Sequence, residues 1–257
     1  MNTEPGARGV AVITGGSRGI GAATAIAAAQ AGWSVLFSYQ HDEQAAVDVV
    51  HTIHAAGGLA SFVRADMANE TDIAAMFNAA DDLGTVTAFV ANAGIAAAQS
   101  RVDELTATRI AEILAVNVAG PVLACGHAVR RMSTLHGGAG GGIILVSSAA
   151  SRLGAPGEYV DYAASKGAID TLGVGLSREV ANEGIRVNVV RPGIIDTELH
   201  GRNGRPDRAK DLAHTIPMQR AGHPAEVAAA IIWLLSDDAG YCSGSILDIA
   251  GGRQIGP

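Results

Sequence analysis

Short apolar runs alternate with longer amphipathic stretches along the whole chain. The apolar runs are rich in β-branched residues and mostly uninterrupted, as expected for strands that are covered on both faces. They predict strands at residues 10–13, 34–39, 60–64, 88–91, 142–147, 186–190 and 245–249. The amphipathic stretches predict helices, among them 20–31, 43–56, 72–80, 109–132, 159–182 and 224–236.

This alternation predicts an α/β fold in which right-handed crossovers link parallel strands. We expect a doubly wound (Rossmann) fold with a seven-stranded, mainly parallel sheet and helices on both faces. No linker divides the chain, so we expect residues 1–257 to form one domain. Residues 136–142 are rich in glycine, and we interpret them as a flexible surface turn because a strand follows them. Residues 198–214 are polar and form either a mobile flap over a pocket or an irregular surface loop.

The composition narrows the class of protein. Of the 257 residues, 48% are hydrophobic and 17% charged, which excludes a disordered chain and allows a large core. A net charge of −7 without a basic stripe argues against nucleic acid and anionic membranes as partners. We find no apolar leader at the N-terminus, and the longest apolar runs are too short to cross a bilayer. Cys125 and Cys242 lack metal-binding spacing, so we expect two reduced thiols and no metal site. Together these observations indicate a cytoplasmic protein.

A glycine-rich turn, T-G-G-S-R-G-I-G at residues 14–21, follows the first predicted strand and opens the first predicted helix. Its glycines permit a tight turn and a close approach of the backbone to a pyrophosphate, while the helix N-terminus offers free N–H groups. Because the strand–turn–helix context is present, we predict a dinucleotide site rather than a turn without a ligand. The predicted cofactor contacts in this turn are Gly15, Ser17, Arg18, Gly19, Ile20 and Gly21.

The choice between NAD and NADP is made at the end of the second strand, where an acidic residue would bind the ribose 2′-hydroxyl and repel a 2′-phosphate. This chain has Ser38 there, and no carboxylate follows until Asp42. Arg18 in the first turn adds a cation near the place of that phosphate. Both features favour NADP(H), although Arg18 is alternatively a solvated surface side chain.

Two further turns follow predicted strands. Asp66 and Met67 come after the third strand, where a carboxylate can accept from an adenine amino group; the alternative is a turn residue before the next helix. The fourth strand ends in Asn92, Ala93 and Gly94, a turn that allows close approach of the backbone to a ligand.

Tyr162 and Lys166 lie four residues apart near the start of a predicted helix. This spacing places them on one face, with both polar ends available to one ligand. A phenol, with a reference pKa of about 10, is a poor acid or base near neutrality. A neighbouring ammonium group favours the phenolate and brings the pKa closer to the working range. Such a pair also occurs on helix surfaces, so its meaning depends on the motifs around it.

Together these motifs resemble those of the short-chain dehydrogenase/reductase family in its single-domain form. The resemblance covers nearly the whole chain, although Ala91 stands where the family frequently has a second Asn. It rests on the order of the motifs: the glycine-rich turn at 14–21, N-A-G at 92–94, A-V-N-V-A-G around Asn117, S-S at 147–148, Y-A-A-S-K at 162–166 and R-P-G-I-I-D-T at 191–197.

The resemblance implies a role for each matching residue. Tyr162 would exchange a proton with the substrate oxygen, and Lys166 would bind the nicotinamide ribose and favour ionisation of Tyr162. Ser148 would hydrogen-bond the substrate oxygen, with Ser147 as a rival because the stretch before Tyr162 is one residue longer than in the common form; either hydroxyl alternatively caps the strand. Asn117 would hold a water molecule in a proton relay. The nicotinamide pocket would be shaped by Pro192, Gly193, Ile195 and Thr197.

The implied function is hydride transfer between NADP(H), or NAD(H), and a small carbonyl or alcohol substrate. We expect reduction of a ketone to a secondary alcohol, because cells usually keep the NADP pool reduced. The alternatives are a 3-oxoacyl thioester reductase, an NAD-dependent sugar or alcohol dehydrogenase, and a regulator that binds NADP without catalysis. A regulator would be free to lose the proton-transfer residues, and this chain keeps all of them. The family analogy further implies a homo-oligomer, a tetramer or a dimer, with interfaces at helices 109–132 and 159–182 and at the C-terminal strand.

Overall fold

The computed structural model describes residues 4–197 and 208–253. Seven parallel strands form one sheet in the order β3-β2-β1-β4-β5-β6-β7, which confirms the predicted doubly wound fold. The strands are β1 (Val10–Ile13), β2 (Ser34–Tyr39), β3 (Leu59–Arg64), β4 (Val86–Ala91), β5 (Gly141–Val146), β6 (Ile185–Pro192) and β7 (Ile246–Ile249). The largest shifts from the predicted bounds are of two residues: β4 begins at Val86 rather than at residue 88, and β6 ends at Pro192 rather than at residue 190.

The α-helices are α1 (Gly19–Gln30), α2 (Glu43–Ala55), α3 (Glu70–Asp81), α4 (Ala107–Leu114), α5 (Gly120–Met132), α6 (Ala150–Leu153), α7 (Val160–Glu179), α9 (Arg208–Asp211) and α10 (Pro224–Leu235). Short 3-10 turns lie between them: η1 (Val102–Glu104), η3 (Thr134–His136), η4 (Ala181–Glu183), η5 (Ala213–Thr215) and η6 (Asp237–Ala239). The six predicted helices are therefore present, and α6 adds a short helix after β5 that the sequence pattern did not indicate.

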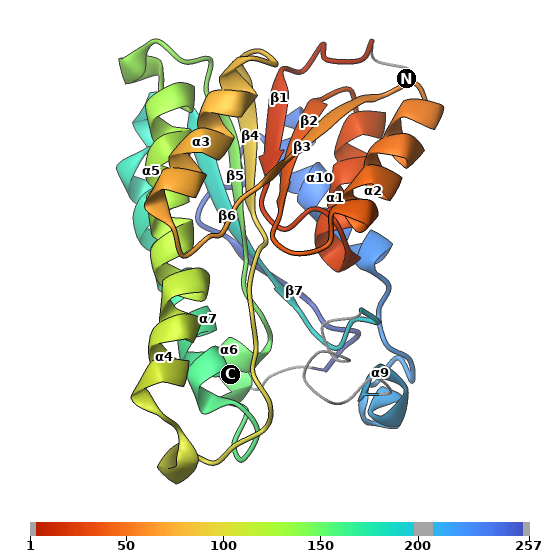
Figure 1. Ribbon diagram of the computed structural model, residues 1–257, viewed down its shortest axis with the longest axis vertical. Coiled ribbons are helices and arrows are strands. Elements are labelled where there is room, and N and C mark those ends of the chain that lie inside the picture. Colours follow the sequence, from red (N-terminus) through yellow and green to blue (C-terminus); the bar gives the residue numbers. More distant parts are fainter. Residues whose placement is uncertain (1–3, 198–207, 254–257) are drawn as a thin grey trace.

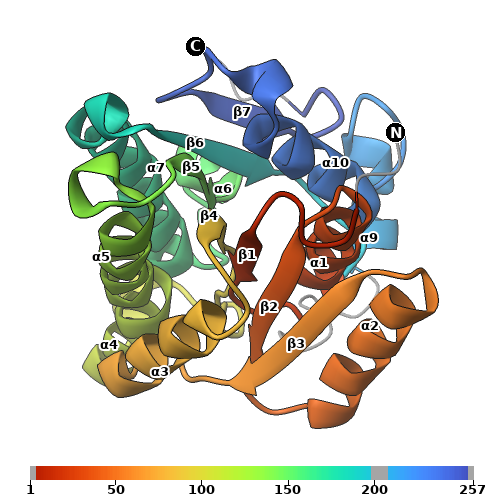
Figure 2. The ribbon, with the colours of Figure 1, turned by 90° about the horizontal axis from the view of Figure 1, so that it is seen from above.

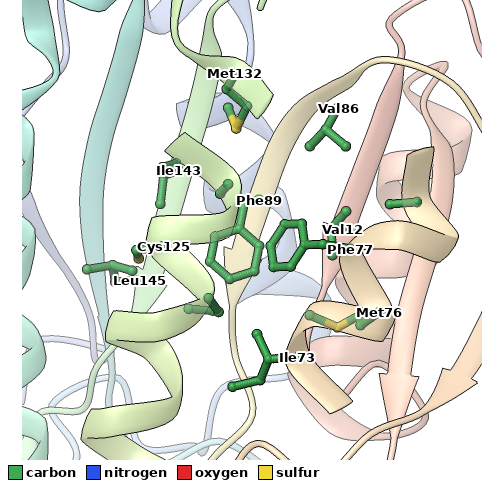
Figure 3. Packing of buried hydrophobic residues seen from close by; sticks show 14 of the residues in the cluster. Val12, Ile73, Met76, Phe77, Val86, Phe89, Cys125, Met132, Ile143 and Leu145 are labelled. Carbon is green, nitrogen blue, oxygen red and sulfur yellow. The ribbon is translucent and has the colours of Figure 1, made fainter. Parts of the chain in front are cut away.

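Helices cover both faces of the sheet (Figures 1 and 2). On one face α3, α5 and α7 pack against the strands, and Phe77, Phe89 and Ile143 lie in the core between them (Figure 3). On the other face α1, α2 and α10 enclose a second core that contains Phe37 and Ile231. Two buried faces explain why the strands are apolar throughout instead of alternating with polar residues.

The predicted helix 109–132 is one helical segment in three parts: α4, a π-helical turn called η2 (Ala115–Ala119), and α5. By length and composition alone, the segment Ala107–Met132 could cross a membrane, which corrects the expectation that no apolar stretch is long enough. Ala124, Ala128 and Met132 are fully buried in the core (Figure 3 shows Met132). The segment is thus a core helix of this fold, and its apolar composition follows from that packing.

Two predicted loops can be compared with the structure. Residues 136–142 form a turn before β5, as predicted, in which Gly138 N donates to Ser133 O (2.8 Å) and Gly140 N to Met132 O (2.7 Å). This turn leads into the amino end of β5 and so lies away from the carboxyl ends of the strands. Of the flap predicted at 198–214, residues 198–207 lie outside the described residues, and the remainder contains α9 and η5.

The chain changes direction across the sheet between β1 and β4. From β1 it continues outward to β2 and β3, and it returns to β4 before continuing to β5, β6 and β7. Such a switch point leaves a crevice at the carboxyl ends of the two central strands, and ligands of doubly wound folds bind there.

Candidate active site

A cavity of about 600 Å³ opens at the carboxyl ends of the central strands. It is lined by every residue that the sequence predicts to contact the cofactor. These are Gly15, Ser17, Arg18, Gly19, Ile20, Gly21, Ser38, Asp66, Met67, Asn92, Ala93, Gly94, Tyr162, Lys166, Pro192, Gly193, Ile195 and Thr197. Residues from six separated stretches of the chain thus meet around one space.

The glycine-rich turn forms one wall of this cavity. Gly15 has a φ of +68°, a conformation that only glycine adopts readily. A Cβ atom on Gly21 would lie 2.1 Å from the carbonyl oxygen of Gly15, so no side chain fits there. Because α1 begins at Gly19, its free N–H groups are at this wall, as phosphate binding requires. The turn therefore fits the pyrophosphate of a dinucleotide.

Hydrogen bonds from neighbouring strands hold the turn in place. Asn92 donates through Nδ2 to the carbonyl oxygens of Thr14 (2.9 Å) and Gly15 (3.1 Å). The Thr14 hydroxyl accepts from the backbone N–H groups of Asn92 (3.0 Å) and Ala93 (2.9 Å). The Ser38 hydroxyl is buried and accepts from Gly15 N (3.1 Å), so it supports the turn from β2. The cradle is thus tied to both strands beside β1.

At the far end of the turn, Arg18 forms an ion pair with Asp42 (Nη2 to Oδ2, 3.1 Å), and both residues line the cavity. Asp42 also caps α2 by accepting from Ala45 N (3.0 Å), which fixes the carboxylate. The sequence analysis treated Asp42 as too distant from the second strand to matter. The structure instead places it beside Arg18, where it orients the guanidinium group and partly neutralises its charge.

Asp66 lines the cavity and also stabilises its own turn, because its Oδ1 accepts from Ala68 N (2.9 Å). The N-cap of α3 is Asn69, not Asp66. Both readings of Asp66 from the sequence therefore have support: it is a turn residue, and it faces the space where a nucleotide would lie.

The Tyr162–Lys166 pair lies on α7 with the Lys166 Nζ atom 5.7 Å from the centre of the Tyr162 ring. Lys166 is buried and donates to the carbonyl oxygen of Val146 (2.8 Å). Burial lowers the pKa of Lys166 to about 8, and the Asp170 carboxylate opposes this shift. Burial also raises the pKa of Tyr162, and a hydrogen bond with Ser148 opposes that shift. At neutral pH the site holds a protonated phenol beside a cation.

The two serines after β5 have different surroundings. Ser147 is buried and donates to the carbonyl oxygen of Lys166 (3.0 Å), so its hydroxyl fastens α7 to the end of the strand. Ser148 is half-buried, hydrogen-bonds Tyr162 and accepts from Ala150 N (3.1 Å). Both line the cavity, but the contact with Tyr162 favours Ser148 as the serine that would meet a substrate oxygen.

Asn117 is fully buried in the π-helical turn and does not line the cavity. Its Oδ1 accepts from Ile95 N (2.8 Å), and its Nδ2 donates to Ile95 O (2.8 Å) and to the Ser165 hydroxyl (3.0 Å). The side chain is thus occupied in fixing the loop after β4 against α7. A Cβ atom on Gly94 would lie 3.4 Å from both the Asn117 Oδ1 atom and the Lys166 Nζ atom, so this amide is close to the lysine, and its water-holding role stays a prediction.

The proposed nicotinamide end is formed by the stretch after β6. Pro192 O accepts from Ala149 N (2.9 Å), and Gly193 N donates to Ile249 O (3.0 Å). A Cβ atom on Gly193 would lie 2.8 Å from the Cα atom of Ala250, so this position accepts only glycine. The stretch 192–197 is therefore packed tightly between the loop after β5 and the end of β7.

The sequence analysis missed several residues that line the same cavity. Tyr159 meets the Tyr162 ring edge-on, with ring centres 5.6 Å apart and an interplanar angle of 88°. The loop after β4 contributes Ile95, Ala96, Ala97 and Gln99. Their position directly after the N-A-G turn was the available signal, since residues beyond the carboxyl end of a central strand reach the crevice. The loop after β5 contributes Leu153, Pro156 and Glu158.

Metal chemistry has no visible ligand set in the described part of the chain. Within the described residues, 4–197 and 208–253, no group of three or more His, Cys, Asp or Glu side chains is arranged to hold a metal ion.

Residues 15–254 match a family model described as Enoyl-(Acyl carrier protein) reductase. The oxidoreductase YgfF of Escherichia coli is 54% identical over 245 residues, which cover 95% of this chain and 99% of that protein. The 3beta-hydroxysteroid dehydrogenase 1 of Eggerthella lenta is 36% identical, over 96% of this chain and 94% of its own. A short chain dehydrogenase from Burkholderia cenocepacia, solved in complex with NADP, has a TM-score of 0.86 at 31% identity and covers 97% of this chain and 98% of its own. These similarities span both the glycine-rich turn and the helix of Tyr162.

Proposed function

The chain belongs to the short-chain dehydrogenase/reductase family, and we propose that it is an NADP(H)-dependent oxidoreductase that interconverts a ketone and a secondary alcohol. One observation carries this proposal: Ser148, Tyr162 and Lys166 line the same cavity as the glycine-rich turn. A dinucleotide held by that turn can therefore extend to the one phenol in the cavity that is paired with a buried cation.

When bound, the nicotinamide ring supplies the hydride for reduction or accepts it for oxidation. In reduction, Tyr162 donates its phenolic proton to the carbonyl oxygen, because burial keeps the phenol protonated at neutral pH. The Ser148 hydroxyl stabilises the negative charge that develops on the same oxygen. Lys166 binds the ribose and, as a cation near the phenol, stabilises the tyrosinate that remains. In oxidation the same residues move the proton in the opposite direction.

The preference for NADP(H) is supported by Arg18 and by the absence of a carboxylate at Ser38. A guanidinium group at the adenosine end of the cavity is suited to a 2′-phosphate, which it can bind through two parallel hydrogen bonds. The relative from Burkholderia cenocepacia was solved with NADP, which supports the same choice. Asp42 is the feature that favours NAD(H), since its carboxylate lines the same end of the cavity.

The substrate end of the cavity has an apolar part in its wall, formed by Ala96, Ala97, Leu153 and Pro156. Such a lining suits a neutral ketone with an apolar body rather than a polyol, and the Eggerthella relative is named for a hydroxysteroid. The family description, which names an acyl carrier protein reductase, favours an acyl thioester as the second candidate.

An NADPH-oxidation screen across ketones, acyl thioesters, quinones and sugars tests the proposal. We expect turnover with a ketone, and a loss of about 10³-fold or more in kcat in Tyr162→Phe with little change in NADPH affinity, because general acid catalysis is removed. Turnover restricted to thioesters would assign the second candidate. NADPH binding without turnover of any substrate class, or full activity in Tyr162→Phe, would instead favour a regulator.

We also propose that the protein acts as a homo-oligomer. Ile110, Leu114, Val122 and Leu123 are more than a third exposed on α4 and α5, although they are large apolar side chains. An apolar row of this kind on one helical segment is typical of a protein interface.

A further inference from the structure

Arg109 joins three separate elements near the substrate end of the cavity. It lies in the first turn of α4, and its Nε and Nη2 atoms donate to the two carboxylate oxygens of Asp161 on α7 (2.7 and 3.2 Å). Its Nη1 atom donates to the carbonyl oxygen of Ala98 in the loop after β4 (2.7 Å). The Asp161 side chain is 3% exposed and that of Arg109 is 18% exposed, so water screens this ion pair little.

Asp161 transmits this contact to the residue that donates the proton. It directly precedes Tyr162, and its Oδ1 accepts from the Tyr162 backbone N–H (2.9 Å). Burial alone would raise the pKa of Asp161, but the hydrogen bonds from Arg109 and from Tyr162 N lower it below its usual value. Asp161 is therefore a carboxylate that depends on Arg109 for its charge balance.

The elements that Arg109 joins are the two walls of the substrate end. Ala97 and Gln99, on either side of Ala98, line one wall, and Tyr159 and Tyr162 line the other. A backbone hydrogen bond from Ser100 N to Glu158 O (2.9 Å) links the same two segments. Asn117, which bonds both Ile95 and Ser165, links the loop after β4 to α7 as well. The separation of the two segments, and with it the position of Tyr162 relative to a bound ketone, thus depends in part on the contacts of Arg109.

The cofactor end is held by other residues. Thr14, Ser38 and Asn92 support the glycine-rich turn through hydrogen bonds with one another and with Gly15, and these bonds do not involve Arg109 or Asp161. A change at Arg109 should therefore disturb the substrate end while the dinucleotide still binds.

From this arrangement we propose that Arg109 and Asp161 are positioning residues for the reaction, a clamp that sets the distance between Tyr162 and the loop 95–101. This inference rests on the proposed function, since it concerns the geometry of proton donation by Tyr162. A displacement of about 1 Å in a reacting group can cost about 10²-fold in rate. Loss of the clamp therefore acts on kcat for the carbonyl substrate rather than on the affinity for NADPH.

The test compares Arg109→Met, Arg109→Lys, Asp161→Asn and the double variant Arg109→Met/Asp161→Asn. We expect each of Arg109→Met and Asp161→Asn to lower kcat by about 10- to 100-fold while the Kd for NADPH changes by less than about threefold. The double variant should be no slower than either single variant, because both act through one contact. Arg109→Lys keeps the charge without the two-pronged geometry and should be intermediate.

Arg101→Met is the matched control. Arg101 lies in the loop 95–101, but its side chain is 73% exposed and pairs with Asp103. It should match the wild type. Unchanged kcat in Arg109→Met, or single losses that multiply in the double variant, would overturn the clamp. Melting temperatures identify any variant that fails to fold. If Arg109→Met is such a variant, the kcat of Arg109→Lys is compared with that of the wild type instead.

Hydrogen exchange separates failure of the clamp from failure of the proposed function. With NADPH bound, amides of residues 95–101 and 158–166 should exchange faster in Arg109→Met than in the wild type, while those of 14–21 should not. This result is independent of turnover. If no ketone is reduced but exchange behaves as stated, the clamp stands and the proposed reaction fails; unchanged exchange refutes the clamp whatever the substrate is.

Discussion

Burial moves both members of the Tyr162–Lys166 pair toward their neutral forms. The phenol keeps its proton more firmly than usual, and the ammonium group loses its proton more easily. With a pKa of about 8, Lys166 is mostly charged at neutral pH, and the Asp170 carboxylate favours that charge. Its charge is therefore the first property of the site that alkaline pH removes.

We expect kcat/KM for NADPH in the reductive direction to fall as the pH rises above about 8. The pKa of Lys166 is below its ordinary value, so the charge is fully present below that pH and is lost above it. Since kcat/KM reports the free enzyme, the fall should follow one deprotonation, about tenfold per pH unit. A pH series with NADPH as the varied substrate measures it. In Lys166→Arg any remaining activity should lose this fall, because arginine keeps its proton; a fall that persists unchanged would contradict the assignment.

Cofactor preference is a second property decided by single residues. Arg18→Ala should raise KM for NADPH by about 10- to 100-fold, the equivalent of one charge-assisted contact, while KM for NADH changes little. Asp42→Asn should lower KM for NADPH, because a carboxylate that competes for Arg18 and repels the 2′-phosphate is removed. Steady-state kinetics with NADPH and with NADH measure these KM values for the wild type and both variants. An equal effect of Arg18→Ala on NADPH and NADH would refute a 2′-phosphate contact.

At the scale of elements, a few polar side chains fix how helices and strands meet. Asn117 lies in a π-helical turn between α4 and α5 and bonds both backbone groups of Ile95. Arg186 on β6 has a similar role at the other side of the sheet. Its guanidinium donates to carbonyl oxygens at the end of α10 and just beyond it, those of Leu234, Leu235, Ser236 and Ala239. The carbonyls of Leu234 and Leu235 belong to the last turn of α10, where helical partners are lacking, so one half-buried cation satisfies part of this helix terminus.

Arg186→Met should therefore destabilise the protein by about 2–4 kcal/mol, because several buried carbonyls lose a charged donor at once. The free energy of unfolding in urea measures the effect, with Arg101→Met as the exposed control that should remain within about 0.5 kcal/mol of the wild type. A difference of less than 1 kcal/mol between the two variants would mean that water replaces the guanidinium at this helix end.

At the scale of the whole molecule, the doubly wound sheet brings distant segments to one edge, and the same packing leaves a helical face uncovered. α4 and α5 bury one face in the core, while Ile110, Leu114, Val122 and Leu123 remain exposed on the segment. The exposed row and the buried row together account for the apolar composition of residues 107–132.

We expect the wild type to be a dimer or tetramer at micromolar concentration, and Leu123→Glu to shift it toward smaller species, because a carboxylate would be buried in the interface without a partner. Light scattering coupled to size-exclusion chromatography measures this. Leu135→Glu is the control, since Leu135 is 71% exposed in η3 rather than on α4 or α5. A monomeric wild type, or equal effects of both substitutions, would contradict this interface.

The sequence by itself determined the features that depend on neighbouring residues. Strand positions follow from runs that are buried on two faces, and the glycine-rich turn follows from conformations that only glycine tolerates, as at Gly15 and Gly21. The i,i+4 spacing of Tyr162 and Lys166 placed both on one face of α7. All of these are local, and for that reason the fold class and the cofactor cradle could be predicted.

Only the tertiary structure decided which distant side chains meet. Arg18 and Asp42 are 24 positions apart, Asn117 and Ile95 are 22 apart, and Arg109 and Asp161 are 52 apart. Periodicity says which face of an element a residue occupies, but not where crossover helices bring that face relative to another loop. Asn117 illustrates the limit: its motif was recognised from the sequence, but only the structure shows that its amide bonds Ile95 and Ser165.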